Sequence, residues 1–179
     1  MPACEDLVLM AAYNADMNRT VYAAAATLPH AELVADRQAF FGSLHNTLSH
    51  IVVADIVWLQ RFRQHPAAWP ALTAMGEFQI PTGLAERIAD DLPALAQLRT
   101  RLDAIISAWA AQLQPADLQQ PFTFHRMNGE QQRKHFGSVL LHFFNHQTHH
   151  RGQASTLLFQ QGVDIGVTDL LAWVPPYAD

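Results

Sequence analysis

The sequence predicts an all-α protein: a four-helix bundle with a long crossover between its second and third helices. Four long stretches carry apolar residues three and four positions apart, which is typical of amphipathic helices. The segment between the second and third stretches, residues 64–83, contains three prolines and two glycines. It is long enough to run back along a helix, so those two helices could be parallel. A chain of 179 residues is expected to form a single domain, residues 1–179.

The first predicted helix spans residues 5–28, is rich in alanine and ends before Pro29, which disfavours helical geometry in the residue before it. The second spans residues 36–63, with Asp36 as its expected N-cap. Its apolar positions are Phe40, Phe41, Leu44, Leu48, Ile51, Trp58 and Phe62.

The third predicted helix covers residues 84–113. Because Pro93 lies inside it, the helix is either kinked there or begins anew with Asp91 as its cap. The fourth covers residues 136–161 and stops at Gly162. Between them, residues 122–126 alternate apolar and polar side chains ahead of an Asn-Gly turn signal, so this segment is either a small β-hairpin or an irregular loop.

Composition narrows the classes of protein and partner. Apolar residues make up 50% and charged residues 15% of the chain, which excludes a disordered protein. The net charge is −5 and Lys134 is the only lysine, so we expect no nucleic-acid partner. No apolar run is long enough to span a bilayer, which takes about 20 residues. The single cysteine, Cys4, and the acidic residues near the N-terminus favour a cytoplasmic location.

Ten histidines are present, and five of them are clustered in and just before the fourth helix: His135, His142, His146, His149 and His150. Two histidines four positions apart lie on one helix face, about 6 Å apart, and could both reach one metal ion. His150 lies on the apolar stripe, with His146 beside it, whereas His142 and His149 fall on the polar side. The pair His146 and His150 is therefore the better candidate, the alternative being hydrogen-bonded core residues.

A third ligand is expected from the second helix. His50 opens its most apolar part and is preferred to His45, which stands in a more polar half. Asp55 is the only charged residue within residues 51–59, and it either orients a ligand histidine or forms a buried pair with an arginine. Arg151 and Gln153 are either polar rim residues or part of a pocket.

Three histidine ligands leave open positions on an ion, as in catalytic metal sites. Nitrogen ligands are compatible with zinc, nickel and ferrous iron, and such an ion can acidify a bound water or thiol. Arg151 is the only basic residue near the fourth-helix histidines in sequence, and no basic cluster marks a site for an anionic thiol.

Two segments, residues 44–59 and 145–153, resemble the signature stretches of the DinB-like (DNA-damage-inducible) family of helical metalloenzymes. The resemblance implies a crossover four-helix bundle, a metal held by His50, His146 and His150, and a homodimer. Related members are thiol-dependent transferases and an isomerase. The resulting hypothesis is a metal-dependent enzyme that uses a low-molecular-weight thiol on a small electrophile. The alternatives are a non-catalytic, metal-binding stress-response bundle and a metallohydrolase.

Overall fold

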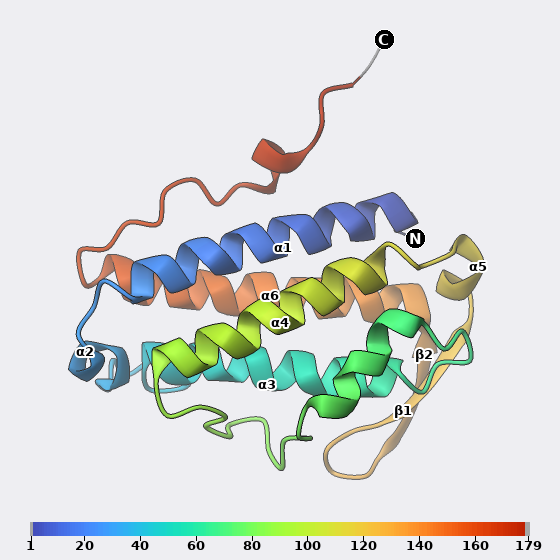
Figure 1. The fold of residues 1–179 in the computed structure, drawn as a ribbon, viewed down its shortest axis with the longest axis horizontal. Helices are drawn as coiled ribbons and strands as arrows, with labels where there is room; N and C mark the ends of the chain where they lie inside the picture. Colours follow the sequence, from blue (N-terminus) through green and yellow to red (C-terminus); the bar gives the residue numbers. More distant parts are fainter. Residues whose placement is uncertain (1, 178–179) are drawn as a thin grey trace.

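Four long helices form a bundle with both parallel and antiparallel neighbours in the computed structural model, which describes residues 2–177. They are α1 (Cys4–Ala25), α3 (Leu44–Phe62), α4 (Leu92–Ala110) and α6 (Phe136–Phe159). Helices α1 and α3 each pack against both α4 and α6. Helices α3 and α4 run in one direction and α1 and α6 in the other (Figure 1). The predicted crossover bundle is confirmed.

The crossover between α3 and α4 contains the 3-10 helix η1 (Pro70–Glu77), which packs against both of them. Its apolar side chains Leu72 and Met75 are buried in the main core. Within the bundle, the aromatic rings of Phe62 and Trp109 stack with their centroids 5.0 Å apart. This aromatic core lies at the end of the bundle where α6 begins, because Phe136 packs edge-on against Phe62.

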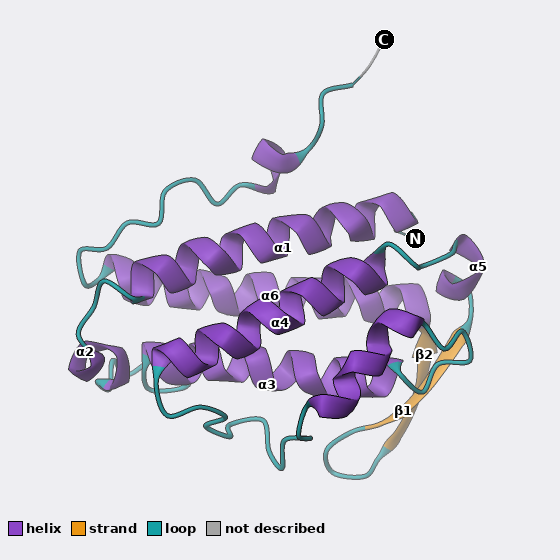
Figure 2. Ribbon diagram, in the orientation of Figure 1, coloured by secondary structure: helices purple, strands orange, loops and turns teal. Residues whose placement is uncertain are grey.

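The hairpin is present and consists of β1 (Pro121–His125) and β2 (Gln131–His135), preceded by the short helix α5 (Pro115–Leu118). Figure 2 shows it as a small two-stranded ribbon at one end of the bundle. The turn contains Gly129 with φ of +84°, a conformation that favours glycine. Phe122 faces Lys134 and Phe124 faces Gln132 across the strands. Because directly paired residues share one face of a sheet, these four side chains point the same way.

The second helix begins later than predicted, and Asp36 is not its N-cap. Residues 30–34 form a separate short helix, α2 (His30–Val34), and residues 36–42 form a turn in which Asp36 accepts a hydrogen bond from the Gln38 amide (2.8 Å). Gln38 and Gly42 both have positive φ, which no helix allows. The true cap is Ser43, whose hydroxyl accepts from the Asn46 amide (3.2 Å).

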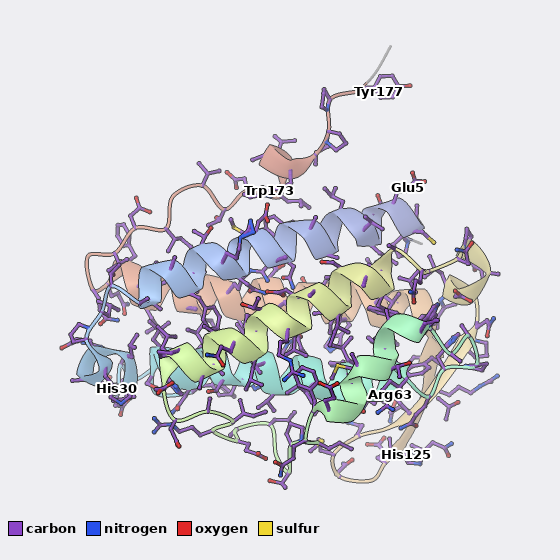
Figure 3. The ribbon with its side chains drawn as sticks, in the orientation of Figure 1. Glu5, His30, Arg63, His125, Trp173 and Tyr177 are labelled. Carbon is purple, nitrogen blue, oxygen red and sulfur yellow. The ribbon has the colours of Figure 1, made fainter. Side chains whose placement is uncertain are left out.

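Helix α4 begins at Leu92 rather than at residue 84, with Asp91 as its N-cap, which was the second of the two alternatives. Pro93 lies in its first turn, where no hydrogen-bond donor is missed. After α6 the chain runs back along the outside of α1 and includes the 3-10 helix η2 (Leu170–Trp173). Trp173 lies against α1 in Figure 3 and donates to Asp16 (2.8 Å). Among residues 2–177, no helix has both the length and the apolarity needed to cross a membrane.

Candidate metal centre

Three histidines predicted to be ligands come together where α3 packs against α6. His50 lies on α3, and His146 and His150 lie one turn apart on α6. Helix α3 is buried at residues 51–57 and 59 of the apolar run predicted over residues 51–59, and His50, just before it, is also buried and points into the bundle. The apolar stripe of α6 is also buried as predicted, and His150 on that stripe is only 8% exposed.

The ring nitrogens of these residues converge. The His146 Nε2 atom is 3.3 Å from His50 Nε2 and 3.1 Å from His150 Nε2. One potential ligand atom from each residue lies within 4.8 Å of the others. Nitrogens bound to a tetrahedral zinc ion at 2.0–2.1 Å are about 3.3 Å apart, so the observed separations fit three nitrogens around one ion.

Hydrogen bonds on the far side of two rings fix which nitrogen is free. His50 Nδ1 lies 2.8 Å from the Leu84 carbonyl oxygen, which can only accept, so Nδ1 carries the proton. His150 Nδ1 lies 2.8 Å from Gln153 Oε1 and is assigned the same tautomer. Both Nε2 atoms therefore present lone pairs toward His146. Carbonyl or amide partners on the outer nitrogen are typical of metal-binding histidines.

Burial keeps all three imidazoles neutral near pH 7. It lowers the pKa of His50 and of His150. Burial, followed by the proximity of the other histidines, lowers the pKa of His146 to about 3. Neutral rings with facing lone pairs repel one another unless a proton or a cation lies between them, so the donor set fits a divalent ion.

One side of the cluster is covered and another is open. The Phe41 ring stacks on His50 with centroids 4.1 Å apart and meets His150 edge-on at 5.5 Å. Elsewhere, His50 and His146 form part of the wall of a cavity of about 780 Å³ between α3, α6 and the hairpin. An ion held by the three histidines would thus be shielded by Phe41 and border the cavity.

The three residues considered for supporting roles have different environments. Gln153 holds His150 through the hydrogen bond described above. Asp55 accepts hydrogen bonds from Arg99 (2.6 Å) and Gln147 (2.8 Å), so it has the predicted pairing with an arginine. Within residues 2–177 its hydrogen bonds do not reach the histidine cluster. Arg151 is buried against α1, where it donates to Asn14, and it does not line the cavity.

The other histidines lie outside the cluster. His142 and His149 are on the exposed side of α6, as the periodicity predicted. His142 lines the cavity and packs edge-on against Trp58. His45 is fully buried despite its polar sequence neighbours. Burial lowers the pKa of His45, and the groups near it include Arg87 and Asp91, just ahead of α4.

Sequence reasoning missed the basic residues of the cavity. Arg61, Arg126 and Lys134 line it together, so the expectation that no basic cluster accompanies the site was wrong. Arg126 and Lys134 lie on the hairpin, far from the histidines in sequence. The one available signal was the spacing of α3, because Arg61 follows His50 by eleven residues, close to three full turns, which places both on one face.

Among the comparisons with known proteins, the one with family models finds a match. No curated protein and no solved structure matches the chain significantly. The model of the DinB family, however, matches residues 1–175, which is nearly the whole chain and includes both helices that carry the histidine cluster. Together with the bundle and its three converging histidines, this match shows that the chain belongs to the DinB family.

Proposed function

We propose that this protein is a metal-dependent enzyme in which His50, His146 and His150 hold a divalent ion, with zinc, nickel and iron as the candidates. The observation that carries the proposal is the convergence of three histidine Nε2 atoms beside a large cavity, which His50 and His146 help to line. A purely structural site needs no such cavity, whereas a catalytic site needs room for a substrate.

The chain's own residues would prepare the site in three ways. Leu84 and Gln153 hold the His50 and His150 rings so that Nε2 faces inward. Phe41 limits water on one side. The apolar wall of Ala54, Val57 and Val139 admits an organic substrate on the other. A bound divalent ion supplies Lewis acidity, which favours the deprotonated form of a thiol or water.

Substitution of the metal ligands tests the site. Purified protein carrying His150→Ala is expected to lose its bound metal, because two remaining histidines hold a divalent ion poorly. The matched control is His142→Ala, on the same helix and one turn from His146, which should keep the metal content of the unsubstituted protein. Metal content is measured by elemental analysis, with anomalous scattering to locate the ion. Full metal retention in His150→Ala would contradict the assignment.

A substrate screen tests the reaction class. The proposal favours transfer of a low-molecular-weight thiol to a small electrophile, so metal-loaded protein is assayed with thiols and electrophilic acceptors, and in parallel with esters and amides. Activity on the second set alone would identify a metallohydrolase. Inactivity on both sets would favour a non-catalytic, metal-binding stress-response protein. The homodimer implied by the family resemblance belongs to this proposal and is tested by the mass of the protein in solution.

A further inference from the structure

The cavity beside the histidines has a charged end that the metal site does not explain. Its lining includes the cations Arg61, Arg126 and Lys134 and no aspartate or glutamate in the described part of the chain. This is unexpected in a protein with 16 acidic and 11 basic residues, whose net charge is −5. Cations gathered in a concave site concentrate anions there.

Arg61 is the best-positioned of these cations. Its guanidinium carbon lies 4.7 Å from the centroid of the Trp58 ring and 5.3 Å from that of Phe124. The two rings hold the half-buried side chain in place. Yet among residues 2–177 Arg61 forms no ion pair and donates no side-chain hydrogen bond, so the edges of its guanidinium remain available.

The cations next to Arg61 are only partly neutralised by carboxylates. Burial, and then repulsion from Arg126, lowers the pKa of Arg61. Arg126 is partly neutralised by Glu130, at 3.3 Å on the exposed side of the hairpin turn. Lys134 forms no ion pair within residues 2–177. It lies opposite Phe122 in the hairpin, so both side chains are on its inward face. An anion between these groups would relieve the repulsion.

The positions of Arg61 and His50 define the shape of a ligand. They are eleven residues apart on one helix, which is about 16 Å along its axis. Between them the cavity wall on α3 consists of Ala54, Val57 and Trp58, which offer apolar and aromatic contacts. A molecule that fills the cavity would therefore place one end near the histidines, an apolar body along α3 and its other end near Arg61.

We infer that the cavity binds an organic anion, anchored by its carboxylate or phosphate group to Arg61 with Lys134 and Arg126 nearby, so that its opposite end lies at the histidines. Planar guanidinium groups bind both kinds of oxyanion through paired hydrogen bonds. The inference deepens the proposed function by naming the substrate class. It depends on the proposed metal site only for the role of the end of the cavity that lies at the histidines.

The test is binding of simple probes to the full-length protein, measured by calorimetry with and without a chelator. The probes are phenylbutyrate, phenylpropyl phosphate and the neutral phenylbutanamide. Both anions should bind more tightly than the amide, and increasing salt should weaken their binding. The stronger of the two anions identifies the preferred group. Equal affinity for the anions and the amide would overturn the inference.

Variants locate the anchor. Arg61→Gln should weaken binding of the anions about tenfold or more and leave that of the amide unchanged. Lys134→Gln, at an exposed position, should produce a smaller loss and does not threaten folding. The matched control is Arg101→Gln, because Arg101 also stacks on an aromatic ring, Phe78 at 4.6 Å, but lies outside this cavity. Unchanged affinity in both cavity variants, or an equal loss in the control, would contradict the inference.

Two further measurements separate this inference from the proposed metal site. Arg61→Gln should keep the full metal content, and metal-free His150→Ala should still bind phenylbutyrate, because His150 does not line the cavity. If the anion binds only in the presence of metal and ignores Arg61→Gln, it binds at the ion and the inference fails. If His150→Ala retains metal, the proposed metal site fails while anchoring at Arg61 stands.

Discussion

Among single residues, His146 occupies the most constrained position of the site. Its Nε2 atom faces the Nε2 atoms of both His50 and His150. In the part of the chain that the structure describes, no hydrogen bond reaches its Nδ1 atom. Burial disfavours the protonated form of His146, and protonation would also place a positive charge beside two other imidazoles. This is the physical reason for its lowered pKa, which is about 3 instead of the ordinary 6.5.

The lowered pKa predicts how the stability of the metal-free protein depends on pH. Between pH 6.5 and about 3 the unfolded chain binds a proton at residue 146 that the folded chain does not. The free energy of unfolding therefore falls as the pH drops below 6.5. The contribution of this residue is up to about 1 kcal/mol per pH unit, reduced by solvent screening.

Denaturant unfolding at about pH 7.5 and pH 5 measures this contribution in chelator-treated protein. His146→Gln cannot titrate, so it should lose less stability on acidification than the unsubstituted protein. The control is His125→Gln, at an exposed position of β1, which should behave like the unsubstituted protein. Identical pH dependence in all three proteins would show that folding does not lower the pKa of His146.

At the scale of elements, helix caps decide where α3 and α4 begin. The carboxylate of Asp91 accepts a hydrogen bond from the Ala94 amide (2.8 Å) at the start of α4. The similar carboxylate of Asp36 instead closes a turn, because the positive φ of Gln38 ends any helical path there. A side chain that can cap a helix therefore indicates a turn of the chain. The φ angles of the residues that follow determine whether a helix begins there.

Removal of the α4 cap should destabilise the protein. Asp91→Ala leaves the Ala94 amide without its partner and is expected to cost about 1 kcal/mol in the free energy of unfolding. Asp90→Ala, one position earlier and exposed, should change it by less than about 0.5 kcal/mol. Chemical denaturation of the two variants provides the comparison. Equal losses would indicate that the cap contributes nothing beyond ordinary surface charge.

At the scale of the whole molecule, one buried polar network connects all four long helices. Arg99 on α4 pairs with Asp55 on α3 (2.6 Å) and with Asp103 one turn along α4 (2.9 Å). Asp103 also accepts from Asn18 on α1, and Asp55 from Gln147 on α6, the residue next to His146. The packing of α3 against α6 at the metal site is thus tied to the centre of the bundle.

Loss of Arg99 should destabilise the whole fold. Arg99→Ala leaves two buried carboxylates without their cation, which is expected to cost about 3–5 kcal/mol. Arg101, also on α4, forms an exposed pair with Glu77 of η1, and Arg101→Ala should cost less than about 1 kcal/mol. Thermal and denaturant unfolding would measure both. Similar small losses would mean that water or neighbouring side chains replace Arg99.

Much of the fold and part of the site were predictable because they depend on local spacing. Periodicity along α6 placed His150 on the buried stripe and His142 and His149 on the exposed side. The apolar run of α3 indicated that His50 points inward, and the proline-rich crossover made parallel α3 and α4 possible. Helix starts were less predictable, as Asp36 illustrates, because caps and turns use the same side chains.

The sequence by itself thus determined the class of fold and which histidines could share an ion. Only the tertiary structure decided the rest of the site. Three features of the site join residues that lie far apart along the chain. The Leu84 carbonyl orients His50, and Arg99 pairs with Asp55. The hairpin places Lys134 in the same cavity wall as Arg61. Such contacts follow from how whole elements pack, since helical periodicity relates residues of one helix and carries no information about its neighbours.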